Sequence, residues 1–321
     1  MRLHFAHFLI QTRNSTMMSS IPKIGLPDSP PPGFDPRKET DDAVLAKYGY
    51  LPRFEKQATP KYKEKWEAII SRGYRFVKPN VLGEEEVVIK SKNWSGAQVY
   101  PPPSGTKFGF IYATWDVPDI SLPSDAKVDD DKWRPGTYRC PKWIGFDGTG
   151  EAHGRVIQTG TGSIISVDDD GEISAKYARA WFEWYPHPPI GVDFQVKFGD
   201  IIDCFLWGIS EVAAVVWFFN STSGEYTSFE FGDEDEKHKL TGDSAEWIVE
   251  DTSGKKGHNY FPDYGTTTFY TTEALSFPTT SEFGFEVSNL TSATLCEIPG
   301  KSTPVKVGPD VLQLYAYDHK P

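Results

Sequence analysis

The chain of 321 residues has little cysteine and no long apolar run. Three cysteines, Cys140, Cys204 and Cys296, are too few for a disulfide scaffold and lack the spacing of a metal site. We expect Cys204, which lies in an apolar run, to be a buried thiol, whereas Cys140 and Cys296 could pair only in an oxidising compartment. The longest apolar run, residues 212–219, falls far short of the roughly 18 residues of a spanning helix, so no membrane association is expected.

Excess basic charge and the common catalytic motifs are also missing. The formal net charge of −12 argues against nucleic acid as a partner. The seven histidines are scattered, with no pair four residues apart, so the sequence predicts no zinc site. The GxSxG, HExxH and CxxC motifs and the phosphate-binding glycine loop are absent. We therefore expect neither a metal nor a cofactor.

The charge that is present divides the chain into a basic head and an acidic body. Residues 1–80 hold 14 Lys and Arg against 8 Asp and Glu, a net of +6, and residues 81–321 hold 19 against 37, a net of −18. Residues 22–36 contain six prolines, which is typical of an extended, mobile linker. The first residues form a weak signal peptide with no convincing cleavage site, so the sequence leaves localisation open.

Two short helices are predicted after this linker. The run Thr40-Asp41-Asp42 offers a cap and an acidic first turn, and Gly49 offers a stop. Thr59 before Pro60 is the favoured cap and first-turn pair, and Gly73 closes this second segment. Its apolar face, which needs a surface to rest on, consists of Tyr62, Trp66, Ile69 and Ile70.

From about residue 87 the sequence is typical of an all-β protein. Short runs rich in aromatic and β-branched residues alternate with Gly, Pro, Asp and Ser clusters at the intervals of an antiparallel β-sandwich. No helix-length amphipathic pattern recurs, which argues against a parallel α/β sheet. We predict a flexible Pro-rich leader over residues 1–36, a basic, partly helical segment over 37–86, and one antiparallel sandwich domain over 87–321.

Polar residues are placed inside these strand-like runs at positions that alternation brings to one face. A half-exposed sheet is one explanation of such a pattern. We favour a cleft, because four strands each present aromatic residues beside the polar ones. The residues concerned are Gln158, Glu183 with Tyr185, Glu246 with Glu250, and Trp143 with Asp147.

Five motifs make the sequence resemble the glutamic peptidases, or eqolisins (family G1), in that family's order over residues 90 to about 275. They are Asn93-Trp94-Ser95-Gly96-Ala97, Trp143-Ile144-Gly145-Phe146-Asp147-Gly148, Ile157-Gln158-Thr159-Gly160, Phe182-Glu183-Trp184-Tyr185-Pro186 and Ala245-Glu246-Trp247-Ile248-Val249-Glu250-Asp251.

The resemblance implies a sandwich of the concanavalin A-like or jelly-roll type. It also implies an acid-acting, fungal-type, secreted endopeptidase that pepstatin does not inhibit and that works on polypeptides, and we expect a monomer. By position, Gln158 matches the family's catalytic Gln and Glu250 its catalytic Glu. The positions that match residues lining the substrate cleft are Trp94, Trp143, Asp147, Glu183 and Tyr185.

This pair suits amide hydrolysis by water, which needs a base for the water and a donor for the developing oxyanion. A Glu carboxylate accepts the proton of the water and returns it to the leaving amine, while the Gln amide donates to the oxyanion. Alternatives are a carbohydrate-binding or glycan-hydrolysing sandwich, with Glu183 and Glu250 as its carboxylate pair, and an inactive family member. The ExDxE strand expected of a glycosidase is absent.

The basic head resembles the propeptides of the same family, which implies a zymogen. We expect the head to hold its helix against the cleft at neutral pH and to be released or cut in acid, between roughly residues 80 and 92. The alternative is an N-terminal extension that stays packed on the sandwich.

Overall fold

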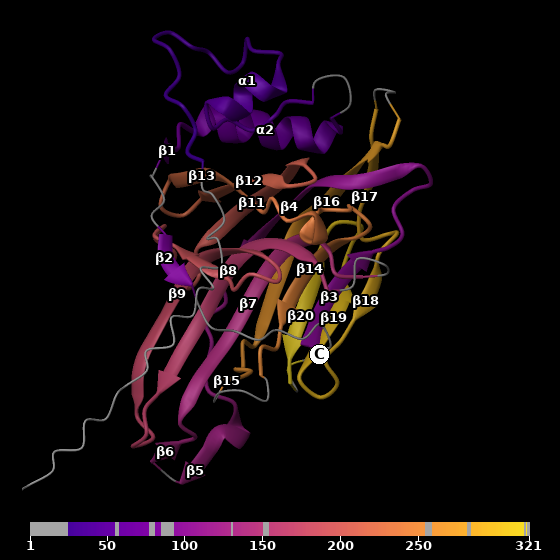
Figure 1. Cartoon of the computed structure of the whole chain (residues 1–321). Coiled ribbons are helices and arrows are strands. Elements are labelled where there is room, and N and C mark those ends of the chain that lie inside the picture. Colours follow the sequence, from indigo (N-terminus) through magenta and orange to yellow (C-terminus); the bar gives the residue numbers. More distant parts are fainter. Residues whose placement is uncertain are drawn as a thin grey trace, which may run out of the picture.

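The computed structural model describes residues 25–54, 58–76, 81–84, 93–129, 131–149, 154–253, 259–280, 284–317 and 319. Two large β-sheets are stacked face to face, and two short helices lie beside one of them (Figure 1). The predicted antiparallel β-sandwich with a partly helical N-terminal segment is therefore confirmed.

Sheet A carries the helices. Its strands follow one another in the order β1 (Arg75–Phe76), β13 (Glu225–Gly232), β12 (Ala213–Asn220), β11 (Ile201–Ser210), β4 (Thr106–Asp116), β16 (Thr266–Pro278), β20 (Leu312–Ala316) and β19 (Ser302–Lys306), with β17 (Glu286–Ser288) also beside β16.

Sheet B carries the five motifs. Its order is β18 (Thr294–Cys296), β3 (Trp94–Val99), β14 (Ala245–Glu250), β7 (Gly136–Asp147), β8 (Val156–Val167), β9 (Ile173–Trp184), β10 (Ile190–Val192) and β2 (Val81–Glu84), with β15 (Asn259–Tyr260) also beside β7. Neighbours in both sheets are antiparallel except for β1 with β13 and β15 with β7. A separate hairpin pairs β5 (Lys127–Asp129) with β6 (Lys132–Trp133).

Alternation along each strand separates the core from the outer faces. In β14, Trp247 and Val249 point into the core between the sheets, while Ile248 packs in a separate cluster on the outer face of sheet B. In β12, Val216 and Phe218 enter the same core, and Trp217 faces outward from sheet A. Each sheet therefore has one face in the shared core and one face that the rest of the molecule can use.

Both helices have the predicted caps. Helix α1 (Asp42–Lys47) starts at Asp41, whose carboxylate accepts a hydrogen bond from Ala43 N at 2.9 Å. Helix α2 (Pro60–Arg72) starts at Thr59, whose Oγ1 accepts from Tyr62 N at 3.0 Å, and it ends at Gly73 with φ +66°. Two single turns of 3-10 helix, η2 (Ser124–Ala126) and η4 (Glu236–His238), lie in loops. No helix among the described residues is long and apolar enough to cross a membrane.

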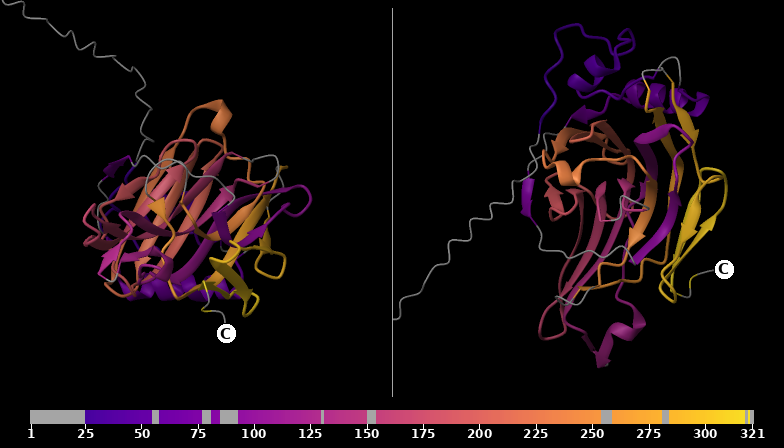
Figure 2. Two further views of the ribbon diagram at one scale, coloured as in Figure 1. Left: turned by 90° about the horizontal axis from the view of Figure 1, so that it is seen from below. Right: turned by 45° about the vertical axis from the view of Figure 1, so that its right-hand side comes forward.

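Helix α2 rests on the outer face of sheet A, so the expectation that it lies against the cleft of sheet B is wrong. Its residues Tyr62, Trp66 and Ile69 are buried in one cluster with aromatic side chains of β4, β11 and β12. Both views of Figure 2 show the indigo helices on one side of the sandwich. Attraction between a basic segment and an acidic body does not select a face, whereas the outer face of sheet A offers the apolar surface that α2 needs. Its side chains include Phe110, Tyr112, Phe205, Trp217, Phe219 and Leu275.

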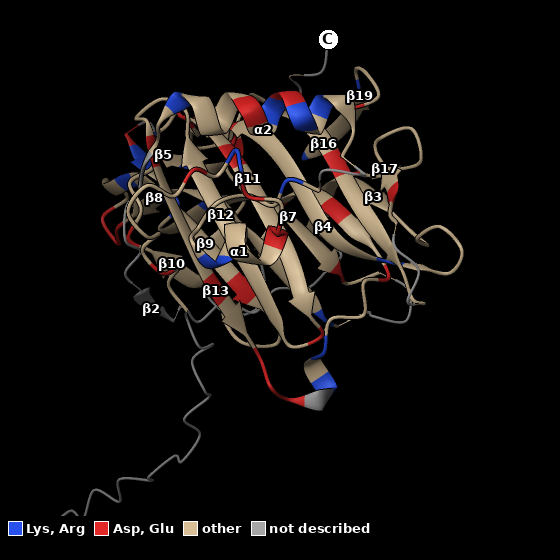
Figure 3. Cartoon of the chain, turned by 90° about the horizontal axis from the view of Figure 1, so that it is seen from above, with Lys and Arg blue, Asp and Glu red and all other residues tan. Residues whose placement is uncertain are grey.

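The predicted attraction between basic head and acidic body is present at this contact. Lys65 Nζ lies 2.5 Å from Asp203 Oδ1 and donates to Thr114 Oγ1 at 2.8 Å. Lys61 pairs with Asp310 and lies 3.7 Å from Glu273 Oε1. Figure 3 shows the charged bands of α2 where the helix crosses the strands.

Backbone pairing also ties the N-terminal part to both sheets. Gly25 bridges to Glu230 of β13, and β1 pairs with β13 in sheet A. Strand β2 pairs with β10 at the edge of sheet B. The described residues of the head are thus integrated into the sandwich. The first 24 residues of the predicted leader lie outside the described residues.

All three cysteines are free thiols. Cys204 is fully buried in the inter-sheet core, as predicted. Cys140 lies in the same core, whereas Cys296 packs at the outer face of sheet B. The sheet itself separates Cys140 from Cys296, so they do not form the pair that the sequence left open.

Replacing Lys65 by Met should destabilise the fold by roughly 1–3 kcal/mol, because the nearly buried Asp203 carboxylate would keep only its hydroxyl partners Thr114 and Ser221. Lys63→Met is the matched control, since Lys63 lies on the same helix and is exposed. The measurement is the urea midpoint of unfolding at pH 7. Equal midpoints for the two variants would show that the Lys65–Asp203 pair adds nothing.

Candidate active site

One row of residues crosses the outer face of sheet B. Strand register places Glu246 of β14 beside Gly145 of β7, Gly145 beside Gln158 of β8, and Gln158 beside Glu183 of β9. Antiparallel neighbours that stand opposite each other point to the same face. The row therefore brings an amide and two carboxyl groups together from three motifs far apart in the sequence.

Gln158 and Glu183 are in direct contact. Gln158 Nε2 lies 2.5 Å from Glu183 Oε2, and the two side chains are 2% and 1% exposed. Burial raises the pKa of Glu183 to about 8, and the bond from Gln158 offsets this only in part. No described group donates to Gln158 Oε1. Glu183 thus fixes one end of the amide and leaves the carbonyl oxygen available.

Glu250, the last residue of β14, is surrounded by tryptophans. Trp143 Nε1 donates to Glu250 Oε2 at 3.1 Å, and Trp94 stands opposite Glu250 across the strand pair. Burial, followed by the nearby Glu183, raises the pKa of Glu250 well above its usual range, and the two indoles oppose this shift. Glu250 Oε1 and Trp94 Nε1 have no hydrogen-bond partner of good geometry among the described residues.

Two glycines bring Gln158 and the Trp143 ring next to each other. A Cβ on Gly145 would lie 3.0 Å from Gln158 Cβ and 3.1 Å from Trp143 Cζ3. A Cβ on Gly160 would lie only 2.1 Å from the carbonyl oxygen of Lys142 and 2.7 Å from Trp143 Cβ. Larger residues at either place would displace the ring that binds Glu250. The glycines therefore connect the amide to the carboxyl group through Trp143.

The structure gives Asp147 a different set of contacts from the other predicted residues. Its carboxylate accepts from Thr241 N at 2.8 Å, from Thr241 Oγ1 at 2.9 Å and from Asp243 N at 2.9 Å. These bonds hold the loop that leads into β14. Burial raises the pKa of Asp147, and the three bonds lower it in part. A role in substrate binding stays a prediction for this residue.

Tyr185 follows β9 directly, and its ring is partly buried against the tryptophan cluster. That cluster consists of Trp94, Trp143, Val156, Trp181 and Ile248. Trp94 and Trp143 meet edge to face with ring centroids 5.0 Å apart. Trp181 is a member that the predicted site residues did not include, although alternation along β9 places it on the face of Glu183.

Glu246 was placed on the predicted cleft face by alternation, but the motif match gave it no role in the site. Its side chain is fully buried, and neither carboxyl oxygen has a hydrogen-bond partner of good geometry among the described residues. Burial raises its pKa well above the usual range, and the nearby Ser244 hydroxyl opposes this shift. Alternation in β14 was the signal, since it places Glu246 on the face of Glu250. Sheet B thus carries three desolvated glutamates on this face, not two.

The polar side chains of this face are closed to solvent. Gln158, Glu183 and Glu250 are each at most 2% exposed, and Trp143 is fully buried. A polypeptide cannot contact them unless this face opens.

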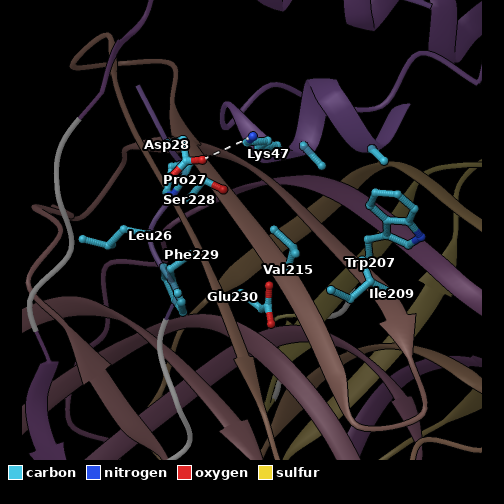
Figure 4. Close-up of a pocket in the computed structure, with 13 residues that line it drawn as sticks. Leu26, Pro27, Asp28, Lys47, Trp207, Ile209, Val215, Ser228, Phe229 and Glu230 are labelled. Carbon is cyan, nitrogen blue, oxygen red and sulfur yellow. Dashed lines mark ion pairs between the residues drawn. The ribbon is translucent and has the colours of Figure 1, made fainter. Parts of the chain in front are cut away.

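A cavity of about 490 Å³ lies elsewhere, between the N-terminal segment and the outer face of sheet A (Figure 4). Leu26 and Pro27 line one side, and Trp207 and Ile209 line the other. Asp28 and Lys47 form an ion pair of 3.7 Å at its edge. The cavity contains none of the residues of the row on sheet B, so its position on the opposite side of the sandwich excludes it as their substrate cleft.

Comparison with known proteins agrees with the five motifs. The model of the Peptidase A4 family matches residues 92–307. Aspergillopepsin-2 of Aspergillus niger is 26% identical over 216 residues, which cover 62% of this chain and 72% of that protein. The resemblance to the glutamic peptidases is confirmed.

Two solved structures have the same fold. Scytalido-glutamic peptidase with a transition-state analogue inhibitor aligns with a TM-score of 0.51 and 21% identity, over 70% of this chain and 98% of its own. The same peptidase with a peptide-based transition-state analogue aligns with a TM-score of 0.50, the same identity and the same coverage.

The raised pKa of Glu183 predicts a protein that is more stable in acid. Between pH of about 4.5 and about 8 the folded chain keeps a proton on Glu183 that the unfolded chain releases, so stability falls as pH rises through this window. We expect the melting temperature to be roughly 4 °C or more higher at pH 5 than at pH 8.

The control for that prediction separates Glu183 from the general effect of net charge. Glu183→Gln should reduce the pH dependence and leave the part that Glu246 and Glu250 contribute, whereas Glu172→Gln, at an exposed position beside β9, should leave it unchanged. Equal slopes for both variants would contradict the assignment to Glu183.

Proposed function

Because this chain belongs to the Peptidase A4 family of peptide-bond hydrolases, we propose that it is an acid-acting endopeptidase in which Gln158 and Glu250 act on one water molecule. The observation that carries the proposal is a pair of oxygens, Gln158 Oε1 and Glu250 Oε1. Both are buried on one face of sheet B, and neither has a hydrogen-bond partner of good geometry among the described groups, although the Trp94 indole lies near the Glu250 carboxyl group. A water between two such acceptors would be held by both of its hydrogens.

Glu250 is the general base and acid of the proposal. As a carboxylate it takes the proton of the water as the oxygen attacks the peptide carbonyl carbon, and it then returns that proton to the leaving nitrogen. Trp143 Nε1 binds the other carboxylate oxygen, which keeps Oε1 directed away from the ring. Proton balance is complete within this cycle, because the carboxyl group ends as it began.

Gln158 supplies the donor for the oxyanion that forms on the same carbon. A side-chain amide does not titrate, so it donates at any acid pH, and one such donor typically contributes roughly 2.7–4 kcal/mol to transition-state stabilisation. Glu183 is the positioning residue for this amide. Gln158 Nε2 donates one hydrogen to Glu183 Oε2, so the second amide hydrogen is left for the oxyanion and Oε1 is left for the water.

The substrates of the proposal are polypeptides. The face around Gln158 and Glu250 carries the rings of Trp94, Trp143 and Trp181, which give apolar contact area next to polar atoms. The relative scytalido-glutamic peptidase has been solved with a peptide-based transition-state analogue, which supports this class of ligand.

A glycan hydrolase is the weaker interpretation of the same face. It would need Glu183 and Glu250 as independent acid and base. Glu183 is bound instead by the Gln158 amide, and such an amide has no role in the two-carboxylate mechanism. This arrangement favours the peptidase.

We also propose that the intact chain is a precursor. Its catalytic groups are closed to solvent, and the desolvation that raises the pKa of Glu250 keeps a proton on the intended base. The helices cover the other side of the sandwich, so their departure would not open this face. We propose cleavage of the chain between roughly residues 80 and 92, as the sequence predicts. Because the helices cover the other side of the sandwich, we expect α1 and α2 to stay bound to sheet A after this cleavage.

Changing either catalytic residue should abolish acid peptidase activity. Glu250→Gln removes the proton acceptor at unchanged size, and Gln158→Ala removes the oxyanion donor. Each should lower kcat/KM for a denatured protein substrate by at least about 100-fold, with wild-type circular dichroism. Glu172→Gln is the control and should retain full activity.

The same assay with pepstatin tests whether the chain shares the pepstatin insensitivity that its family resemblance implies, and we expect no inhibition. Substantial activity of purified Glu250→Gln or Gln158→Ala would refute the catalytic roles of these two residues. Absence of activity in wild type on proteins, with activity on a polysaccharide, would favour the glycan hydrolase.

Incubation at pH 4 should convert the wild-type chain into a form with a new terminus between roughly residues 80 and 92, and activity should rise with it. Edman sequencing identifies the terminus. Glu250→Gln should stay intact under the same conditions. Because α2 buries aromatic residues of sheet A, the cleaved N-terminal fragment should stay bound and co-elute with the sandwich domain on gel filtration. A full-length chain that is fully active and stays uncut in acid would overturn the precursor proposal.

A further inference from the structure

His187 meets Asp233 and His238, which lie about 50 residues further along the chain, at one edge of the fold. His187 Nε2 lies 2.7 Å from Asp233 Oδ2, and His238 Nδ1 lies 2.6 Å from the same oxygen. The three atoms all lie within 4.8 Å of one another. Spacing in the sequence gave no sign of this cluster, because His187 and His238 follow different strands.

The backbone holds each member of the cluster in place. His187 N donates to Trp184 O at 3.0 Å, in the turn after β9. Asp233 follows β13, and its second oxygen, Oδ1, accepts from Asp235 N at 2.9 Å. His238 ends η4, and its carbonyl oxygen accepts from Trp184 Nε1 at 2.8 Å. The donor atoms are thus positioned by groups that a ligand would not have to displace.

Among the described residues, the two imidazoles are the hydrogen-bond partners of Asp233 Oδ2. The Asp233 side chain is 5% exposed, while those of His187 and His238 are 15% and 22% exposed. The two rings are nearly perpendicular, with centroids 5.7 Å apart. A buried carboxylate is therefore approached by two imidazoles from different directions, on a side that water can reach.

Two imidazole nitrogens and one carboxylate oxygen are a donor set that Zn²⁺ prefers, with bonds of about 2.0–2.2 Å. Neighbouring ligand atoms of a tetrahedral zinc ion are about 3.3 Å apart, so each nitrogen would move away from Asp233 Oδ2 by about 0.7 Å. Rotation of two partly exposed rings is enough for that shift. The fourth position would face solvent and take water.

We propose that His187, Asp233 and His238 bind one Zn²⁺ ion at neutral pH. The ion would join the turn after β9 to the loop between β13 and β14. That turn begins with Tyr185, and the loop carries Thr241 and Asp243, which bind the carboxylate of Asp147. Zinc would thus stabilise the surroundings of the candidate active site without taking part in peptide hydrolysis.

The experiment is calorimetric titration of the untagged, chelator-treated full-length chain with zinc chloride at pH 7.5. We expect saturable binding of one ion per chain and a rise in melting temperature that grows with zinc concentration. His187→Ala and His238→Ala should each weaken binding at least about tenfold.

His319→Ala is the matched control. His319 Nε2 lies 2.9 Å from Asp263 Oδ2, so this is a histidine–aspartate pair without a second histidine, and the variant should bind zinc like wild type. No saturable binding by the wild-type chain would overturn the proposal and leave the three residues as a hydrogen-bonded bridge. Unchanged binding in both His187→Ala and His238→Ala would place the ion elsewhere and overturn it equally.

Discussion

Desolvation of carboxyl groups on the outer face of sheet B is the constraint that links fold, stability and chemistry in this chain. Glu183, Glu246 and Glu250 are buried there, and burial is the first cause of each raised pKa. A charged carboxylate in such surroundings is costly, so these groups hold their protons. A fold built in this way is more stable in acid, because these groups stay protonated there.

The outer face of sheet A, on the opposite side of the sandwich, is covered by a helix. The outer face of sheet A is aromatic, and an exposed face of that kind would promote association. Helix α2 covers it with Tyr62, Trp66 and Ile69, and Lys61 and Lys65 satisfy carboxylates at its border. Lys61 and Lys65 of the basic head therefore serve the docking of α2 on sheet A and do not contact the outer face of sheet B.

Much of this arrangement could be predicted from sequence because it depends on local rules. Alternation along β9 and β14 put Glu183 and Glu250 on the outer face, and the cap residues Asp41 and Thr59 gave the starts of both helices. The prediction that α2 lies against the cleft of sheet B was wrong. An apolar stripe indicates that a helix packs on some apolar surface, but it does not indicate which one.

Contacts made by loops could not be predicted from the sequence either. The bonds from residues 241 and 243 to Asp147 depend on the path of a loop that has no sequence signature. The meeting of His187 with His238 depends on β9 and β13 ending at one edge of the fold. Both sets of contacts depend on which distant segments lie side by side in the fold, and no local sequence pattern indicates that.

The central claim is that Gln158 and Glu250 act together on the reacting carbon of a peptide. A crystal structure of the acid-treated chain with a peptide-based transition-state analogue tests it most directly. The account predicts that the two oxygens on the tetrahedral carbon lie within hydrogen-bond distance of the Gln158 amide and the Glu250 carboxyl group, on the outer face of sheet B. An analogue bound without contact to either residue, or seated in the cavity beneath α1, would contradict it.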